Sequence, residues 1–458
     1  MRIATRKKNG NAGNILALTL IVATVLAIAL TSFLFLTNVR SHSVARSQLW
    51  NESLTVAEAG IEDGLAYINK YVGQQNMTNW INTYAEDNWQ YSNNVFWVTR
   101  YMDTAKTRYY TVYVTNTAVN PMIRSTGYVP NSSWAGTGRP LSRTILIGTK
   151  TKQYFNAAMA ALGTIDLKGN NIATDSFDSS ATNWPGYWTN TIRSAFGDVV
   201  TDNQITNSTL NAGNANIAGH VKTGPTGTLL YNANVSIGDL PWVDASTPGI
   251  EPGYYANDLN VTFDDVVVPN VSWMPVTSLG GLGGSGTAPD GKTYAHIFTK
   301  AANGGFYTLK DSGDIYVDTN VMVTVQVLNS VGTFAPQNLF VAGTGANSGK
   351  FVAYCDCPSV WLGTGDEPQS AVAGNMVFLG TPNCTALKYN GNGDFTGAMY
   401  MPEAVFTLVG GGSGVLDFVG SSVTQRVQMN GHYHFHYDLA LKTWSPNNAY
   451  VAAAWREL

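Results

Sequence analysis

An uncharged run near the N-terminus limits what this chain can fold into more than any other feature. From Ile15 to Leu36 there are 22 consecutive residues without a charged side chain. As an α-helix, a run of this length extends about 33 Å, enough to cross the hydrocarbon core of a bilayer. The apolar part of a secretory signal peptide is usually only about 7–15 residues long. The run therefore predicts a membrane-spanning helix, although Ala27-Ile28-Ala29 also has the small-x-small form of a signal peptidase site.

The charges on either side of this run predict its orientation. Arg2, Arg6, Lys7 and Lys8 precede it, whereas only Arg40 and Arg46 follow it closely. The positive-inside rule places the more basic flank in the cytoplasm. We therefore expect a single-pass protein of the cytoplasmic membrane, with the N-terminus inside and the rest of the chain in the periplasm or outside the cell.

The helical pattern continues beyond the membrane. No proline occurs between Asn38 and Tyr71, and apolar residues recur at helical spacing as far as Ile68. We predict a basic leader over residues 1–13 and one transmembrane and stem helix over 14–71. Gly60 and Gly64 form a G-x-x-x-G element, which suits either an approaching backbone of another chain or a notch against this protein's own next domain.

Composition predicts that most of the remainder is β-structure. Charged residues are 12% of the chain, about half the usual share, and Val, Thr and aromatic residues favour strands. The formal net charge of −4 gives no reason to expect nucleic acid as a partner. Three cysteines are too few for a disulfide scaffold, and Cys355 and Cys357 are too close in sequence to bridge without strain. In an oxidising compartment one of them is expected to pair with Cys384, and Cys357 is the candidate.

Two β-rich regions are predicted after the stem. Residues 72–162 suggest a small mixed α+β region that ends in a short amphipathic helix over 152–162. Residues 163–458 contain segments with glycines six residues apart, at 374–380, 391–397 and 414–420, which begin 17 and 23 residues from one another. Such spacing is typical of one coil of a β-solenoid. We therefore predict a right-handed parallel β-helix, interrupted by a glycine-rich loop at 280–292, with a β-sandwich as the alternative.

A histidine-rich stretch over residues 432–438 is the most chemically suggestive motif. In a strand, His432, His434, His436 and Asp438 alternate with aromatic residues and point to one face. Neighbouring members of such a series can share a metal ion, so His432 and His434 are weak candidate ligands, whereas the first and third histidines are about 13 Å apart. The alternative is a strand whose aromatic face seals the core, and on that interpretation there is no metal.

No other pattern indicates catalysis. Asp264 and Asp265 are adjacent and face opposite ways in a strand, and the Asp175–Asp178 segment is also typical of Asx turns. None of these pairs has the separation that a glycosidase needs, and no nucleotide-binding, zinc-protease or nucleophile-elbow motif is present. We expect no enzyme activity, no catalytic residues and no cofactor. Trp184 and Trp188 are candidates for stacking against sugars or proteins, or for packing within turns.

The basic leader, the glycine before the long apolar helix and the element Ala57-Glu58-Ala59-Gly60 resemble the PilX-type minor pilins and related pseudopilins. The resemblance covers roughly residues 6–70. It implies cleavage by prepilin peptidase after a glycine, with Gly13 as the best candidate and Gly10 the second. Major pilins carry an acidic residue five places into the mature chain, and Leu18 stands there in this sequence. That difference favours a low-copy or terminal subunit. Residues 157–440 resemble, more faintly, uncharacterised bacterial surface proteins.

These observations lead to three functional hypotheses. The leading one is a minor pilin or pseudopilin-like surface protein that presents a β-rich region for assembly or adhesion. Its partners would be other pilin-like subunits or secretion and pilus machinery, inner-membrane lipid, and surface glycans or proteins. The second is a simple membrane-anchored envelope protein, and the third is a tethered glycan-active β-helix enzyme.

The first prediction concerns processing. If prepilin peptidase cleaves the leader, the mature chain begins at Asn14, and Gly13→Val blocks maturation. Mass spectrometry of the mature N-terminus checks this. A chain that begins at Leu30 would instead indicate a secreted protein released by signal peptidase.

Overall fold

The computed structural model describes residues 12–70, 80–81, 83–115, 121–131, 139–169, 171–202, 209–225, 227–260, 262–276, 284–301, 303–363, 366–391, 393–410, 414–446 and 449–458. It confirms a mainly β protein with a long N-terminal apolar helix. The chain divides into two compact units. The first unit comprises Met1–Lys152 with Asn447–Leu458, and the second comprises Gln153–Pro446. Gly10 and most of the predicted leader lie outside the described residues.

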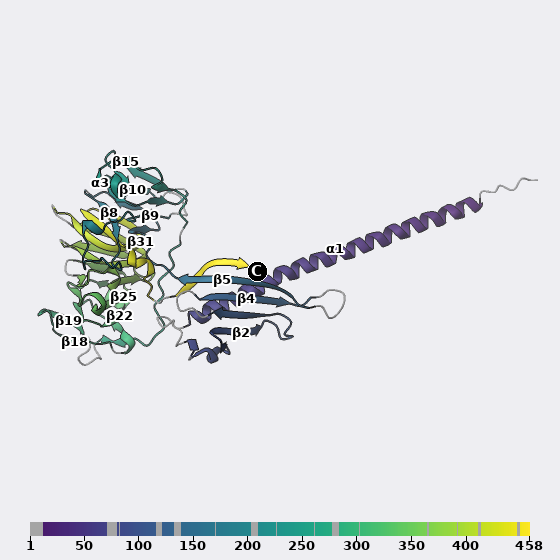
Figure 1. Cartoon of the computed structure of the whole chain (residues 1–458), viewed down its shortest axis with the longest axis horizontal. Coiled ribbons are helices and arrows are strands. Elements are labelled where there is room, and N and C mark those ends of the chain that lie inside the picture. Colours follow the sequence, from purple (N-terminus) through teal and green to yellow (C-terminus); the bar gives the residue numbers. More distant parts are fainter. Residues whose placement is uncertain are drawn as a thin grey trace, which may run out of the picture. The chain divides into compact units, whose positions relative to one another are not determined.

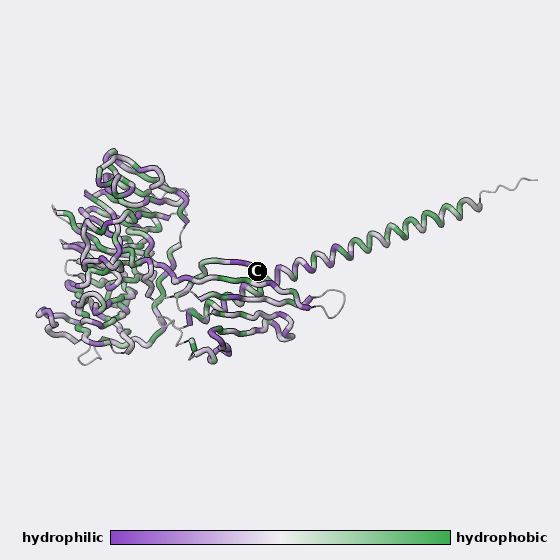
Figure 2. The backbone as a smooth tube through the Cα atoms, viewed as in Figure 1, coloured by the Kyte–Doolittle hydropathy of each residue, from purple (hydrophilic) through white to green (hydrophobic). Residues whose placement is uncertain are grey.

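The first unit is organised around helix α1 (Ala12–Ile68). Large apolar side chains from Ile15 to Val39 are exposed to between 48% and 76% of their surface. Figure 2 shows this half of the helix as predominantly hydrophobic. The helix is long and apolar enough to cross a membrane by length and composition. The C-terminal half is different, because Val56, Ala57, Ile61 and Ile68 are buried. One continuous helix therefore carries an unpartnered apolar segment and a packed segment.

An antiparallel sheet of six strands covers the packed half of α1 (Figure 1). Its strands, in spatial order, are β1 (Gln90–Ser92), β2 (Val95–Tyr101), β3 (Tyr109–Thr115), β4 (Met122–Val129), β5 (Leu141–Thr151) and β33 (Tyr450–Glu457). The short helix η1 (Tyr84–Asp87) precedes the first strand.

The last strand of the chain belongs to this first sheet, where it pairs with β5. Arg143 on β5 forms two short ion-pair contacts with Glu457, at 2.6 and 2.5 Å. The Asn69 side chain, just after α1, donates to the Tyr450 carbonyl and accepts from the Tyr450 N–H. The predicted boundary at 162/163, with everything up to 458 in one β-rich region, therefore differs from the observed division. The difference arises because an edge strand can pair with a sheet formed hundreds of residues earlier in the chain.

Glycines allow α1 to lie close against this sheet. A Cβ at Gly60 would collide with Ser125 and Tyr110, and one at Gly64 would lie 2.6 Å from Ile123. On the sheet side, a Cβ at Gly127 would overlap backbone atoms of Ser53 and Ala57. The G-x-x-x-G element is therefore a notch against the protein's own sheet. Polar contacts also join α1 to the sheet. Arg100 of β2 and Tyr110 of β3 both donate to the Asp63 carboxylate of α1, at 2.6 and 3.1 Å.

The second unit is built from parallel ladders. The first ladder contains, in spatial order, β17 (Met274–Pro275), β20 (Phe306–Leu309), β22 (Met322–Val327), β25 (Lys350–Cys355), β28 (Met376–Gly380), β30 (Phe395–Gly410), β31 (Leu416–Met429), β6 (Met159–Ala161), β9 (Val199–Thr201), β12 (Val221–Thr223) and β16 (Tyr255–Ala256). The predicted helix over 152–162 is wrong at β6, because Met159–Ala161 is fully buried and paired on both sides as a strand.

Two further ladders run beside the first one. The second ladder contains β23 (Thr333–Phe334), β26 (Ser359–Leu362), β29 (Ala386–Gly391), β30, β31, β7 (Ile165–Leu167), β10 (Thr209–Gly213) and β13 (Thr228–Tyr231). The third ladder contains β30, β31, β32 (Tyr433–Asp438), β8 (Ala173–Phe177), β11 (Asn216–Ala218), β14 (Ser236–Gly238) and β15 (Gly249–Ile250).

A five-stranded sheet completes the β-structure of this unit. It consists of β18 (Gly284–Thr287), β19 (Thr293–Phe298), β21 (Ile315–Val317), β24 (Leu339–Val341) and β27 (Asp366–Pro368), and only its β18–β19 pair is antiparallel. Short helices occupy the turns: η2 (Asn190–Ile192), α3 (Leu240–Asp244), η4 (Asn303–Gly305), η5 (Asn329–Val331), η6 (Gly345–Asn347), η7 (Ala373–Asn375) and η8 (Leu439–Thr443). Part of the predicted 280–292 loop is thus strand β18, and residues 280–283 lie outside the described residues.

The predicted glycine spacing agrees with the observed register only in part. Gly397 pairs with Gly420, 23 residues later, in the β30–β31 ladder. Gly380, which is 17 residues before Gly397, pairs instead with Cys355. A Cβ at Gly380 would lie 2.8 Å from Met401, so that glycine accommodates a neighbouring side chain.

The order of strands in space differs from their order in the chain. β31 and β32, near the end of the unit, pair with β6, β7 and β8 at its beginning. In Figure 1 the yellow β31 accordingly lies between the teal strands β9 and β10 and the green strands β25 and β22. The chain reaches one end of the stack at β15 and β16, and resumes at the other end with β17. Residues 257–273 make this connection.

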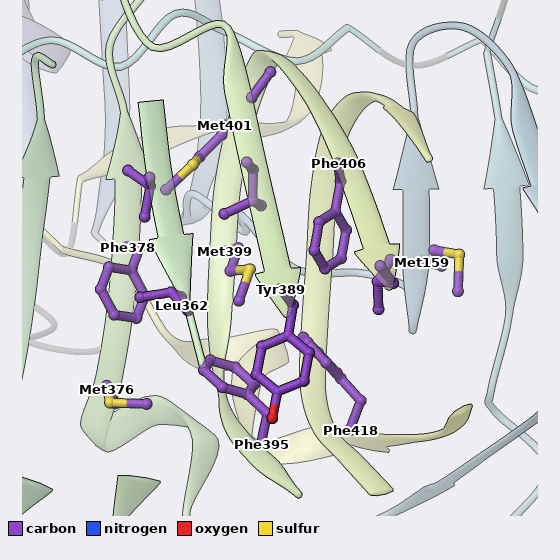
Figure 3. Close-up of a cluster of buried hydrophobic side chains, with 14 of the residues drawn as sticks. Met159, Leu362, Met376, Phe378, Tyr389, Phe395, Met399, Met401, Phe406 and Phe418 are labelled. Carbon is purple, nitrogen blue, oxygen red and sulfur yellow. The ribbon is translucent and has the colours of Figure 1, made fainter. Parts of the chain in front are cut away.

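The interior of the stack is apolar and continuous across the junction. Figure 3 shows Met159 of β6 beside Phe406 of β30, in the same cluster as Met399 and Met401. Phe395, Phe418 and Phe435 stack in succession, with ring centroids 4.9 and 4.3 Å apart. A second buried cluster lies on the outer face of the first ladder and includes Val266 of the connecting segment. The Tyr400 hydroxyl there donates to the Asp264 carbonyl at 2.9 Å.

We predict that Gly127→Ala destabilises the first unit by about 1–3 kcal/mol, because the added methyl group overpacks the contact with the α1 backbone. Gly148→Ala in the adjacent strand is the matched control, since a Cβ there would meet nothing closer than 3.9 Å. Hydrogen exchange of α1 and β4 amides in the detergent-solubilised chain measures both effects. Equal protection in the two variants would show that the close approach of α1 at Gly127 does not affect the stability of the first unit.

Candidate functional site

The most unusual cluster of polar side chains lies in the third ladder, where the last strands of the second unit meet the first. Asp417 of β31 is directly opposite His434 of β32, and His436 is opposite Asp175 of β8. Period-two alternation turns His434 and His436 away from the interior that Tyr433 and Phe435 fill. Residues about 260 positions apart in the chain are thereby brought into hydrogen-bond contact.

His436 is the centre of this cluster. Its Nδ1 lies 2.7 Å from Asp175 Oδ1, and its Nε2 lies 3.2 Å from Asp417 Oδ1. Only 1% of the residue is exposed. Burial lowers the pKa of His436, but the two carboxylates outweigh it and raise the pKa above its ordinary value. A buried imidazole is thus held between two acceptors, which fixes its ring orientation.

Asp175 is itself held by a cation. Arg193 Nε donates to Asp175 Oδ2 at 2.7 Å, and Arg193 Nη1 also contacts Asp244 at 3.0 Å. The Asp175 side chain is 6% exposed. Arg193 therefore compensates the charge of a carboxylate that would otherwise be costly to bury. The result is a chain of contacts from Arg193 through Asp175 to the His436 ring.

His434 and Asp417 form the more open side of the cluster. His434 is half-buried, and burial, followed by the nearby His436, lowers its pKa. The Asp417 side chain is 37% exposed. One ligand atom each from Asp417, His434 and His436 can be chosen so that all three lie within 4.8 Å of one another. Two imidazoles and one carboxylate at such distances form a donor set that divalent transition metals use.

The segment between β8 and β9 covers this cluster. Trp188 stacks on His436 with ring centroids 3.6 Å apart, and its indole Nε1 is buried with no hydrogen-bond partner among the described residues. Trp184 stacks on Phe177 at 4.9 Å. Both tryptophans are thus at least partly engaged in packing, and Trp188 shields His436 from solvent.

The other residues singled out from the sequence lie elsewhere. His432 precedes β32 and is not part of the three-residue cluster, in which His434 lies with His436 and Asp417. Whether any of these histidines binds a metal stays a prediction. Asp178 forms the expected Asx turn with Ser180, and Asp438 accepts from Ser179 and Ala440. Asp264 and Asp265 lie in the connecting segment. Gly13 is in the first turns of α1.

The predicted disulfide between Cys357 and Cys384 is absent. Cys355, Cys357 and Cys384 are buried free thiols. Cys357 Sγ donates to the Ser359 carbonyl at 3.3 Å, whereas Cys384 packs 3.9 Å from the Met401 sulfur. Burial raises the pKa of Cys384 to about 12, which keeps that thiol protonated. These cysteines behave as small apolar core residues.

The sequence pattern identified the histidines but not their carboxylate partners. Asp417 and Asp175 are distant from the motif in sequence, and only the register of the β31–β32–β8 pairing brings them to it. The strand alternation that predicted one shared face for the histidines was the usable signal. No local pattern indicates that Trp188 covers that face.

Residues 303–444 match the model of a domain of unknown function, DUF7305. That range includes Asp417, His434 and His436 but not Asp175, Arg193 or Trp188. No curated protein matches the chain. Among solved structures, the competence-associated pilin ComZ from Thermus thermophilus aligns over 89% of this chain and 97% of its own, at 10% identity and a TM-score of 0.22.

One buried carboxyl group lies apart from the cluster. Asp366 of β27 is 0% exposed, and its Oδ2 accepts from the Gly363 N–H at 2.7 Å. Its Oδ1 has no hydrogen-bond partner among the described residues. Burial raises the pKa of Asp366 to about 7. Because the folded pKa exceeds the ordinary value of about 3.9, protonated Asp366 favours the folded state at low pH.

We therefore predict that the stabilisation of the folded state by protonated Asp366 is complete below about pH 4 and is lost as the pH rises to 7. Asp366→Asn should make the second unit more stable than wild type at pH 8, by up to roughly 4 kcal/mol for a shift of about three pKa units. At pH 4.5 the gain should nearly vanish. Urea unfolding of the full chain in detergent measures it, with the exposed Asp258→Asn as control. The same gain at both pH values would contradict a raised pKa.

Proposed function

We propose that this chain is a membrane-anchored, pilin-like surface protein that assembles through α1 and presents the second unit outside the cytoplasmic membrane. The observation that carries the proposal is the division of α1 into two halves. The Ile15–Val39 segment exposes its apolar side chains, whereas the segment from Ser53 to Ile68 packs on a sheet of its own unit. An exposed apolar segment of this length needs lipid or the helices of other subunits to cover it.

We infer that the second unit is the predicted right-handed parallel β-helix. The support is that the paired strands of its 22-stranded sheet are parallel throughout the described residues and that β6 to β14 pass in turn through the first, second and third ladders. From β22 to β27 the third place is taken by β24 and β27 of the five-stranded sheet. Successive partners in the first ladder are separated by 28, 25, 21 and 23 residues, from the pairs Met322–Lys350, Phe351–Met376, Val377–Ala398 and Ala398–Ser421. That is the length of one coil with three short strands.

The role of the second unit is proposed to be binding rather than catalysis. An open pocket of about 740 Å³ in this unit is lined by Trp184, Lys350 and Asn375, together with three serines and one threonine. An aromatic ring among hydroxyl and amide groups suits contact with a glycan or a protein surface. Adhesion is therefore the favoured role, with other pilin-like subunits and pilus or secretion machinery as assembly partners. A simple envelope anchor and a tethered glycan-active enzyme are the competing functions.

An arginine near the centre of the apolar segment tests anchoring and assembly together. Ala23→Arg should cost roughly 2.5–3.5 kcal/mol of membrane insertion and deplete the protein from membranes. Ser47→Arg, on the exposed part of α1 beyond the apolar run, is the matched control and should remain bound. Cell fractionation with immunoblotting measures both.

Sheared surface filaments distinguish a pilin-like protein from a simple anchor. The wild-type chain and Ser47→Arg should be recovered in the sheared fraction, and a strain without prepilin peptidase should lose that recovery. A wild-type chain that is found in membranes but never in filaments would favour the simple envelope anchor. Equal recovery of wild type and Ala23→Arg in the soluble fraction would contradict anchoring altogether.

A further inference from the structure

We propose that Asp417, His434 and His436 bind one divalent transition-metal ion of the Zn²⁺ type, with Asp175 orienting His436 from behind. This site would lie on the outer face of the third ladder, at the junction between the last and first strands of the second unit. It is independent of the pilin-like function proposed for the whole chain.

The donor atoms are of the right kind and nearly in place. His436 Nε2 and Asp417 Oδ1 are 3.2 Å apart, and the three chosen ligand atoms lie within 4.8 Å of one another. In a tetrahedral site with bonds of 2.0–2.1 Å, ligand atoms are separated by about 3.3 Å. The ligand nitrogen of half-exposed His434 therefore has to move closer to the other two ligand atoms by at most about 1.5 Å. Two histidines and one carboxylate leave a fourth position for water or another ligand.

The surroundings of His436 match what a metal-bound histidine requires. Such a residue almost always donates its second ring N–H to a carboxylate or carbonyl group, which fixes the tautomer and the ring orientation. Asp175 Oδ1 lies 2.7 Å from His436 Nδ1 and is held on its other side by Arg193. In the metal-bound form Nδ1–H donates to Asp175, which leaves the lone pair of Nε2, the nitrogen on the Asp417 side, for the ion. Trp188 stacks on the ring and keeps it from rotating.

The alternative explanation is a hydrogen-bonded triad in which protonated His436 links Asp175 to Asp417 without any metal. In that case His434 has no necessary part, although it stands beside the triad on the same face. The two explanations differ in whether His434 and Asp417 matter for Zn²⁺ binding, and this difference can be measured.

The test is calorimetric titration of the full chain in detergent with Zn²⁺, using a preparation without a polyhistidine tag. Wild type should bind one ion. His434→Ala and Asp417→Asn should each weaken the affinity by about 100-fold or more, beyond the 10–100-fold typical of an orienting group. Asp175→Asn should weaken it by about 10–100-fold and keep the one-to-one stoichiometry. His432→Ala is the matched control, because it removes a histidine from the same segment and should leave the affinity unchanged.

Thermal melting of the same variants provides a second readout. Zn²⁺ should raise the melting temperature of wild type and His432→Ala, but not that of His434→Ala or Asp417→Asn. Absence of Zn²⁺ binding by the folded wild-type chain would overturn the proposal. So would equal binding by all four variants, and unchanged affinity in Asp175→Asn would overturn the orienting role of that residue.

Discussion

The second unit depends on the pairing of its last strands with its first. β31 and β32 form parallel ladders with β6, β7 and β8, so the strands that close the unit are paired with the strands that open it. Without this ladder the unit would be two separate stacks, each with an unprotected edge. The apolar interior is continuous across the same boundary, where Met159 joins the cluster of Met399, Met401 and Phe406 (Figure 3). Both ends of the stack are therefore formed by strands from the middle of the chain.

This arrangement also explains the connectivity and the site. Because β6 and β32 both pair with β31, the chain enters and leaves the second unit at the same junction, and its last residues then form β33 in the first unit. The same register places Asp175 opposite His436 and Asp417 opposite His434. A displacement of one residue in either ladder would turn these side chains to the opposite face. The polar cluster therefore exists only if the ladder forms in this register.

The sequence predicted the features that are local in the chain. Charge-free length and apolar spacing indicated α1, and glycine and β-branched residues indicated a β-rich remainder. It failed where distant segments pair. β33 was assigned to the wrong region because its partner β5 is about 300 residues earlier, and Met159–Ala161 was expected to be helical because its burial on both sides is a tertiary effect. The predicted disulfide failed because cysteine spacing does not show which thiols face each other: Cys357 and Cys384 share one interior, but the first donates to the Ser359 carbonyl and the second packs on Met401.

Cleavage of the connecting segment tests the closing ladder most directly. A specific protease site placed within residues 257–273 would cut the chain between β16 and β17 and so divide the second unit between two fragments. If the β31–β32 ladder with β6, β7 and β8 holds the two halves together, the amides of these strands should keep their hydrogen-exchange protection after cleavage, and the protein should keep its β circular dichroism. Loss of that protection would contradict the account even if the fragments elute together on gel filtration, because β33 also joins them through β5. Separation of the fragments under native conditions, or loss of the β signal on cleavage, would contradict the account.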